Sequence, residues 1–400
     1  MLSSAPMAMR AAARRAVRSS PSITTAPNSN RCVVGLNYSR SFSSARSARP
    51  IAHRVVSGIA SQQQRGYAAT TNPNPPLGKK NASNDVPSRI GLIGARGYTG
   101  QALVELLNNH PYMDLRHVSS RELAGQELQG YSKRKITYEN LDAEAVLQLD
   151  SEVDCWIMAL PNGVCKPFVD ILNQGEKKSL IVDLSADYRF DDSWTYGLPE
   201  LQKRSDICQS SRISNPGCYS TGSQLGIGHC LTISTGVKRS MSPLTRPVFG
   251  VSGYSGAGTK PSPKNDVKLL HDNLIAYSLT GHIHEREVAH SLGLGQSEVA
   301  LMPHVASWFR GIHLTISIPL KEKMDSRTIR QIYQDRYAGE KLVKVVGEAP
   351  LVKDIAGKHH VEIGGFAVDS TGKRVVVAAT IDNLSKGAAT QCLQNMNLAL

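Results

Sequence analysis

Acidic residues are absent from the first part of this 400-residue chain: none occurs between Met1 and Asn84, where 12 lysines and arginines stand. The formal net charge of +13 comes from 46 basic and 33 acidic residues. Without those 12 basic residues, 34 remain against 33 acids, a net charge of +1. Such a balance excludes the basic surface that nucleic-acid-binding proteins need, so we expect no nucleic-acid partner.

Long apolar runs and paired cysteines are also missing. No stretch of about 18 uncharged apolar residues occurs, so we expect no membrane-spanning helix and no membrane partner. The seven cysteines show no metal-binding or redox spacing, which indicates free thiols in a reducing compartment.

The acid-free leader is rich in arginine and serine, a composition typical of organelle transit peptides. Arg65 lies three positions before the small residue Ala68, a spacing similar to a mitochondrial processing site cut after Tyr67. We therefore expect a transit peptide over residues 1–67, a linker rich in proline and asparagine over 68–87, and a location in the mitochondrial matrix. A cytosolic tail and a plastid address remain the alternatives.

A glycine-rich loop follows the first predicted strand, which ends at Ile93. Gly94, Gly97 and Gly100 precede a segment with apolar residues at helical spacing. Glycines at such a junction let the backbone approach a pyrophosphate, whose charge the helix N-terminus meets. The loop predicts a dinucleotide site, with ordinary turn glycines as the alternative.

The second predicted strand, Leu115 to Val118, ends at Ser119, Ser120 and Arg121. Hydroxyls and an arginine at this place suit the extra phosphate of NADP, whereas an acid would suit NAD. Glu122 next to them weakens the distinction. The sequence favours NADP.

Strands and helices continue to alternate up to residue 217, which predicts an α/β domain with a doubly wound parallel sheet over residues 88–217. Ligands of such sheets lie beyond the carboxyl ends of the strands. Pro161, Asn162, Ser185 and Arg189 follow two of these strands, and we expect them to contact nicotinamide or substrate.

Cys218 follows Pro216 and Gly217 and precedes a helical pattern, so it is predicted near a helix N-terminus. The amides and dipole there stabilise a thiolate, which is the nucleophile of covalent acyl chemistry. Asn215, just before this turn, is a candidate substrate contact. An inert buried cysteine is the alternative.

Longer alternating strands after Cys218 predict an α+β catalytic and dimerisation domain over residues 218–375, with an antiparallel or mixed sheet. Ser370 to Gly372 predicts a hairpin between two of its strands. We expect residues 376–400 to form a strand and a helix that return to the first domain.

A glycine–serine loop in this domain suits an anion, because successive backbone amides can point at it. Its candidate substrate contacts are Ser252, Gly253, Ser255 and Gly256. A flexible turn is the alternative. Arg310 is a candidate to bind a carboxylate through two hydrogen bonds, with a solvated loop arginine as the alternative.

His282 and His284 precede Glu287 in a second polar segment. No third metal ligand stands at a familiar spacing, so we expect no metal. A histidine oriented by a carboxylate can move a proton to or from substrate. Two ordinary histidines remain the alternative.

From Ile90 to Leu400 the chain resembles the N-acetyl-gamma-glutamyl-phosphate reductases, NADPH-dependent enzymes of arginine biosynthesis, and above all the reductase half of fungal mitochondrial kinase–reductase polyproteins. Several collinear motifs carry the resemblance: Gly-Ala-Arg-Gly-Tyr-Thr-Gly, Ser-Asn-Pro-Gly-Cys-Tyr-Ser-Thr, Ser-Gly-Tyr-Ser-Gly-Ala-Gly, Gly-His-Ile-His-Glu-Arg-Glu and Ile-Asp-Asn-Leu-Ser-Lys-Gly.

The resemblance implies that Cys218 is the acylated nucleophile and His282 the acid/base, oriented by Glu287, with His284 at the substrate. Spacing alone does not decide between the two histidines. The motifs add further cofactor contacts: Arg96, Tyr98, Thr99 and Asn383. The resemblance also implies a homo-oligomer, dimer or tetramer, and association with N-acetylglutamate kinase. No kinase segment precedes Ile90, so we expect a stand-alone or processed enzyme.

Two other functions stay open from the sequence. One is reduction of a different acyl phosphate, as by aspartate-semialdehyde dehydrogenase. The other is a non-catalytic NADP-binding regulator that keeps the scaffold.

Overall fold

Two β-sheets organise the part of the chain that the computed structural model describes, residues 86–175, 179–234 and 245–400. The expected transit peptide and all but the end of the expected linker lie outside these ranges. Within them, no helix is both long and apolar enough to cross a membrane. Five cysteines within them are free thiols: Cys155, Cys165, Cys208, Cys218 and Cys392.

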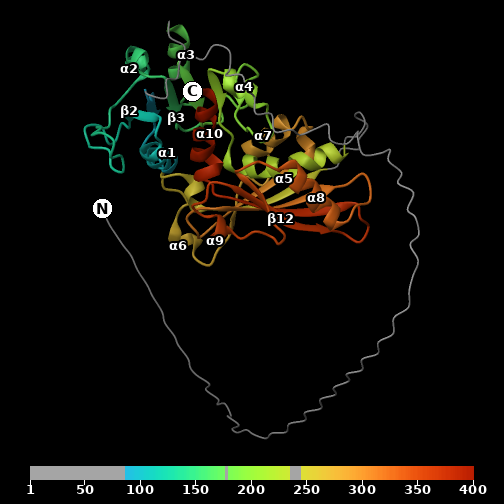
Figure 1. The fold of residues 1–400 in the computed structure, drawn as a ribbon. Helices are drawn as coiled ribbons and strands as arrows, with labels where there is room; N and C mark the ends of the chain where they lie inside the picture. Colours follow the sequence, from blue (N-terminus) through green and yellow to red (C-terminus); the bar gives the residue numbers. More distant parts are fainter. Residues whose placement is uncertain (1–85, 176–178, 235–244) are drawn as a thin grey trace, which may run out of the picture. The chain divides into compact units, whose positions relative to one another are not determined.

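The first sheet is parallel throughout and has the strand order β2-β1-β3-β4-β6-β5. Its strands are β1 (Ser88–Ile93), β2 (Met113–Ser119), β3 (Cys155–Met158), β4 (Leu180–Asp183), β5 (Thr195–Tyr196) and β6 (Arg212–Ser214). The helices between them are α1 (Tyr98–Asn109), α2 (Ala143–Leu149), η1 (Asp150–Glu152), α3 (Lys166–Gln174) and α4 (Arg204–Gln209). The predicted doubly wound sheet is confirmed (Figure 1).

Both faces of this sheet are buried, which explains why its strands read as continuous apolar runs. Ile90 and Leu92 face the cluster that includes α1, whereas Ile93 faces the cluster of α3. Gly91 lies under the ring of Trp156: a Cβ there would come within 2.3 Å of the indole. The predicted cofactor loop after β1 therefore follows a strand that is tightly packed against its neighbour.

The second sheet is mixed and has the order β11-β12-β13-β10-β7-β9-β8. Its strands are β7 (Arg246–Gly253), β8 (Ile275–Ala276), β9 (Val299–Ala306), β10 (Ile312–Pro319), β11 (Val343–Val345), β12 (Val361–Val368) and β13 (Arg374–Ile381). The predicted hairpin joins β12 to β13. The sequence analysis missed β9, which runs parallel to β7.

Helices cover one face of the second sheet. The remaining elements are α5 (Cys218–Ser234), η2 (Tyr254–Ala257), α6 (Val267–Leu270), α7 (Ile283–Ser291), η3 (Gln296–Glu298), α8 (Ser326–Arg336) and α9 (Val352–Ile355). Figure 1 shows α5 and α8 on the same side of the sheet. Gly222 and Gly226 let α5 approach closely, since a Cβ on either would come within 2.6 Å of Leu314 or Ile316.

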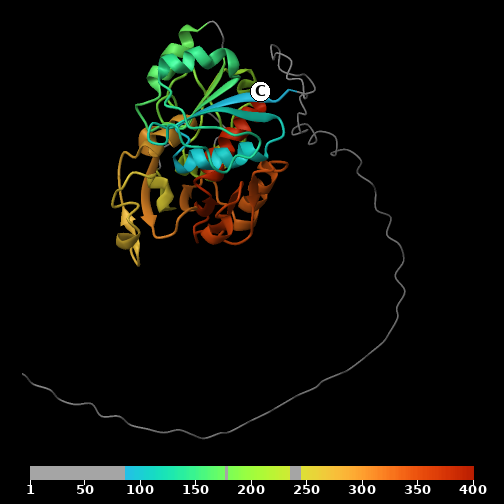
Figure 2. The same ribbon diagram turned by 90° about the vertical axis from the view of Figure 1, so that its left-hand side faces the viewer.

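The chain ends in a π-helical turn, η4 (Ser385–Ala389), and in α10 (Thr390–Ala399). These elements contact α1, α4 and β4 of the first sheet as well as α5 (Figure 2). The strand β13, in contrast, pairs with β10 and β12 of the second sheet. We expected residues 376–400 to return to the first domain as a strand and a helix, and the expectation is wrong for the strand.

A buried lysine holds this C-terminal segment. The ammonium of Lys386 donates to Glu200 at 2.8 Å, to Gln394 at 2.6 Å and to Gln391, and the lysine and Glu200 side chains have 0% exposure. Such a pair is costly to break from one side, because the remaining charge stays buried without a partner.

We predict that Lys386→Met lowers the free energy of unfolding by about 3 to 5 kcal/mol. Adding Glu200→Gln is expected to recover part of this loss, because no uncompensated charge then remains. Urea denaturation at neutral pH measures both. If the free energy of unfolding of Lys386→Met lay within about 1 kcal/mol of the wild-type value, the prediction would be contradicted.

Candidate active site

Cys218 is the first residue of α5, as predicted. Its thiol is half-buried and packs against Gly387, where an added Cβ would come within 2.8 Å of the cysteine Cβ. Burial raises the pKa of Cys218 to about 11, although the amide of Tyr219 and the charge of Arg189 lower it. The thiol of the ligand-free protein is therefore protonated at neutral pH, so thiolate formation needs a proton acceptor.

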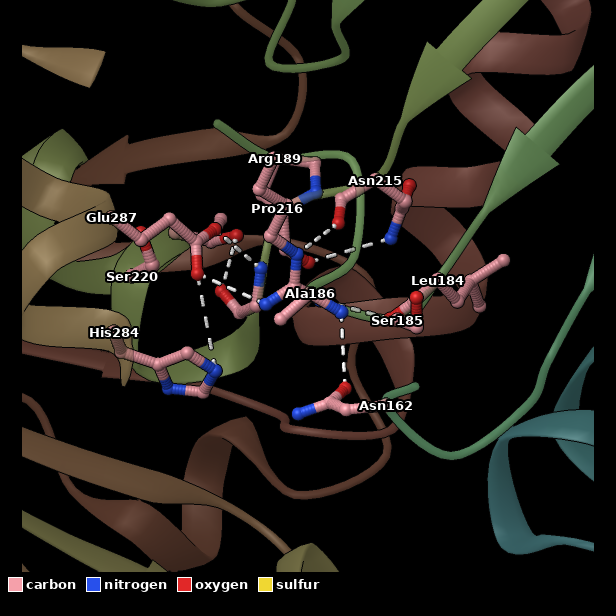
Figure 3. A network of polar contacts seen from close by, with 12 residues as sticks. Asn162, Leu184, Ser185, Ala186, Arg189, Asn215, Pro216, Ser220, His284 and Glu287 are labelled. Carbon is pink, nitrogen blue, oxygen red and sulfur yellow. Dashed lines mark hydrogen bonds and ion pairs between the residues drawn. The ribbon is translucent and has the colours of Figure 1, made fainter. Parts of the chain in front are cut away.

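A fully buried carboxylate, Glu287 on α7, organises the turn before Cys218 (Figure 3). It accepts hydrogen bonds from the amide of Gly217 at 2.9 Å, the hydroxyl of Tyr196 at 2.7 Å and the guanidinium of Arg189 at 2.9 Å. Burial raises the pKa of Glu287, but the charge of Arg189 together with His284 and the hydrogen bonds from Gly217 and Tyr196 lowers it by more, so the pKa is lowered overall. Glu287 thus fixes the backbone that carries the cysteine.

His284 lies against this turn. Its Nε2 is 4.0 Å from a carboxylate oxygen of Glu287 and would be 2.2 Å from a Cβ added to Gly217. Only glycine fits at position 217. Burial lowers the pKa of His284 to about 3, so its ring is neutral. Its Nδ1 is buried and has no hydrogen-bond partner within the described ranges.

His282 caps the N-terminus of α7, where its Nδ1 accepts from the amide of His284 at 3.1 Å. A ring that accepts at Nδ1 carries its proton on Nε2 when neutral. Burial lowers the pKa of His282, and the charge of Lys264 lowers it further. Glu287 contacts His284, and its effect on His282 is an electrostatic one that raises the pKa.

The guanidinium of Arg189 makes several hydrogen bonds within the protein, and its expected contact with substrate stays a prediction. Besides Glu287, it donates to the carbonyl oxygens of Asn215 at 2.9 Å and Leu184 at 2.8 Å. The side-chain amide of Asn215 in turn donates to Ala388 at 3.3 Å and accepts from Asn395 at 3.1 Å. Both side chains therefore hold the loop ends around Cys218 in place.

The glycine–serine loop is also used differently than expected. The amides of Gly253, Tyr254 and Ser255 donate to carbonyl oxygens of the segment 308–311, and Ser252 donates to Gly253. The expected anion site at Ser252, Gly253 and Ser255 is therefore wrong insofar as it rests on free amides. Gly256 lies in the short helix η2 beyond them.

Arg310 is likewise paired. Its guanidinium donates to Asp382 at 2.5 and 2.9 Å and to Ser385 at 2.8 Å. These bonds use Nε and Nη2, and the expected contact of Arg310 with a substrate carboxylate stays a prediction. Asn383 accepts from Gly311 at 2.8 Å and donates to Ser255 at 2.9 Å, so it joins the glycine–serine loop to the end of β13.

The predicted cofactor loop fits a dinucleotide. Gly94 has φ +88°, and Cβ atoms on Gly94 and Gly100 would come within 2.2 Å of Ala159 and 2.6 Å of Gly94. The N-cap residue of α1 is Gly97, which makes no side-chain hydrogen bond to the first turn, and the first amides of a helix have no intrahelical partner. Both features suit a pyrophosphate at the helix N-terminus.

The expected residues for the extra phosphate lie together at the end of β2. Ser119 and Ser120 are buried and Arg121 is exposed. Arg96 forms an ion pair with Glu122 at 2.9 Å in the same region. Pro161 and Asn162 follow β3, and Asn162 accepts from the amide of Ala186, while Ser185 donates to the buried Asp183.

Three tyrosines near the thiol were missed by the sequence analysis. Tyr196 binds Glu287, and the hydroxyl of Tyr219 donates to His304 at 2.7 Å. The rings of Tyr219 and Tyr277 lie 6.1 and 5.8 Å from that of His282. Only Tyr219 carried a signal, its place next to Cys218. The described ranges hold no group of three potential metal ligands.

Comparison with known proteins is consistent with this geometry. The semialdehyde dehydrogenase NAD binding domain matches residues 89–210, and the dimerisation domain of the same family matches residues 218–383. N-acetyl-gamma-glutamyl-phosphate reductase from Stenotrophomonas maltophilia is 50% identical over 320 residues, 79% of this chain and 96% of that protein.

The chain belongs to the N-acetyl-gamma-glutamyl-phosphate reductase family. Protein arg-6, mitochondrial, from Neurospora crassa is 66% identical over 343 residues, 84% of this chain. The chain spans only 38% of that protein's length.

Aspartate semialdehyde dehydrogenases share the fold. The enzyme from Vibrio cholerae, solved with ASA, has a TM-score of 0.63 at 16% identity and covers 78% of this chain and 98% of its own. The enzyme from Candida albicans, solved with NADP, has a TM-score of 0.60 at 16% identity and covers the same shares.

The buried neutral state of His284 predicts acid sensitivity. The unfolded imidazole gains a proton near its ordinary pKa of 6.5, whereas the folded one does so only near 3. Stability is therefore complete above that ordinary value and falls as the pH drops below it, by up to about 1.4 kcal/mol per pH unit from this group.

We expect His284→Asn to flatten this slope between about pH 6 and pH 5, as measured by urea denaturation. The exposed His271 provides a matched control, since His271→Asn is expected to keep the wild-type slope. An unchanged slope in His284→Asn would contradict the prediction.

Proposed function

We propose that this chain reduces N-acetyl-L-glutamyl 5-phosphate to N-acetyl-L-glutamate 5-semialdehyde with NADPH and releases phosphate, the reaction for which its bacterial relatives are named. The observation that carries the proposal is the placement of Cys218 at the start of α5, on a turn fixed by Glu287 and covered by His284. This constellation supplies a nucleophile with a proton-transfer group beside it.

Acylation begins with Cys218 as a thiolate. The ring of His284 is neutral, because burial lowers its pKa, and one of its nitrogens can therefore take the thiol proton, whereas Nδ1 of His282 already accepts from the His284 amide. The amide of Tyr219 and the charge of Arg189 favour the thiolate once formed. Attack on the acyl phosphate forms a Cys218 thioester and expels phosphate.

The thioester carbonyl becomes an oxyanion on reduction. When bound, NADPH supplies the hydride for this step. We assign the stabilisation of the oxyanion to His282, because its Nε2–H can donate to the oxyanion while Nδ1 accepts from the His284 amide. The proton that the thiol gave up during acylation then completes the thiohemiacetal. Glu287 positions the pair through His284, and collapse of the adduct returns the thiol.

The residues proposed to hold the cofactor are those of the α1 loop and the β2 end. The loop Gly94–Gly100 would take the pyrophosphate, and Ser119, Ser120 and Arg121 the extra phosphate of NADP. A related fold solved with NADP supports this choice. Pro161, Asn162 and Ser185 lie at the strand ends where nicotinamide would be held.

Sequence identity argues against the first alternative function, reduction of a different acyl phosphate as by aspartate-semialdehyde dehydrogenase. It is 50% identical to the bacterial reductase but 16% identical to aspartate semialdehyde dehydrogenases of the same fold. A non-catalytic regulator would have no need for a cysteine, two histidines and a buried carboxylate around one turn.

Assembly and location complete the proposal. The uncovered face of the second sheet includes Phe249, which is 39% exposed, and the matched family domain is a dimerisation domain, so we expect a homo-oligomer built on this face. Fungal relatives are named mitochondrial, which supports the matrix as the location. Association with N-acetylglutamate kinase belongs to the same proposal.

The test is reverse turnover, with N-acetylglutamate semialdehyde, phosphate and either NADP or NAD. Wild type is expected to reduce NADP through repeated turnovers only when phosphate is present, because phosphate releases the acyl group from Cys218. Cys218→Ser should lower this rate by about a thousandfold or more while keeping NADPH binding, because it removes the nucleophile.

Cys208→Ser is the matched control, since Cys208 is another free, half-buried thiol. It is expected to keep the wild-type rate. A Cys218→Ser rate close to wild type, or equal losses in both variants, would refute the assignment.

A further inference from the structure

The charges around the candidate active site are unevenly compensated. Arg189 is paired with Glu287 at 2.9 Å and Arg310 with Asp382 at 2.5 Å. Lys264, in the loop between η2 and α6, has no carboxylate within ion-pair distance in the part of the chain that the structure describes. The substrate of the proposed reaction, in contrast, is an anion at both ends.

Lys264 lies at the edge of the histidine pair. Its ammonium is 4.8 Å from the ring centroid of Tyr277, and that ring is 5.8 Å from the ring of His282. The lysine is half-buried, and its charge contributes to the lowered pKa of His282. Tyr277 in turn lies close enough to Cys218 for the thiol to affect its pKa, which burial raises to about 12.

The loop that carries Lys264 is held in place by its neighbour. The side chain of Asn265 donates to the carbonyl oxygens of Gly258 at 2.9 Å and Lys260 at 2.8 Å, and accepts from Ser262 at 2.8 Å. The ammonium is therefore presented from a fixed backbone, with the face of Tyr277 beneath it. A cation on an aromatic face keeps its charge available for an anion.

We propose that Lys264 binds an oxyanion of the substrate, its α-carboxylate or its phosphoryl group, beside His282. Sequence motifs directed attention to Arg310 and the glycine–serine loop, but those donors are occupied within the protein. Lys264 places a cation on Tyr277 beside His282, and no carboxylate of the described ranges lies within ion-pair distance of it. The inference rests on the proposed reaction, since that reaction defines the anion.

The test compares Lys264→Met with Lys264→Arg and with Lys260→Gln. Lys260 is an exposed lysine in the same loop, so its variant removes the same charge without touching Tyr277. Reverse turnover gives separate KM values for phosphate and for the semialdehyde. Loss of one charge-assisted hydrogen bond is expected to raise one of them about tenfold or more in Lys264→Met.

The two anion sources predict different results. A rise in the KM for phosphate alone identifies the phosphoryl group, and a rise in the KM for the semialdehyde alone identifies the carboxylate. Lys264→Arg should restore most of the loss, and Lys260→Gln should behave as wild type. Unchanged KM values, or equal effects of Lys264→Met and Lys260→Gln, would overturn the inference.

A second readout does not depend on turnover. The charged groups that act on His282 are Lys264, Glu287 and Glu285. Removing the charge of Lys264 is expected to raise the pKa of His282, and a proton NMR titration of the His282 ring measures this change. An unchanged pKa would place the ammonium away from the histidine and overturn the inference. If wild type itself fails to reduce NADP, the proposed reaction fails, whereas the NMR result still reports the position of Lys264.

Discussion

The buried carboxylate of Glu287 is the group on which the arrangement around Cys218 depends. It binds the backbone just before the cysteine, a tyrosine from β5 and an arginine from the loop after β4, and it lies beside His284. A buried charge is stable only when it is fully hydrogen-bonded and paired. The arginine, the tyrosine and the backbone amide belong to the first sheet and the loops after its strands, whereas Glu287 lies on α7, which packs against β9 of the second sheet. The contacts that stabilise Glu287 therefore join the cofactor-binding side to the second domain next to the cysteine.

The neighbouring polar groups follow the same pattern. Asp382 pairs with Arg310, and Lys386 pairs with Glu200, and both pairs hold the segment at the end of β13. That segment brings Gly387 against Cys218. The arginines that the sequence analysis assigned to substrate therefore also hold the backbone in place, through ion pairs with buried carboxylates.

Much of this fold could be predicted from short sequence motifs. Gly94 and Gly100 marked the cofactor loop because only glycine fits the close contacts there, and Pro216 and Gly217 marked the start of α5. The partners of the charged residues could not be predicted. Arg189 and Glu287 are 98 positions apart, and Arg310 and Asp382 are 72 apart, so no spacing rule relates them. For the same reason β9, which pairs in parallel with β7 across a long connection, was missed.

Covalent acylation of Cys218 is the central claim, and peptide mass spectrometry tests it most directly. The full chain is incubated with N-acetylglutamate semialdehyde and NADP, without phosphate, so that a thioester once formed is not released by phosphate. If Cys218 is the nucleophile, its peptide gains the mass of one N-acetylglutamyl group, which hydroxylamine removes. NADP reduction without any adduct, or an adduct on Cys208 instead, would contradict the claim.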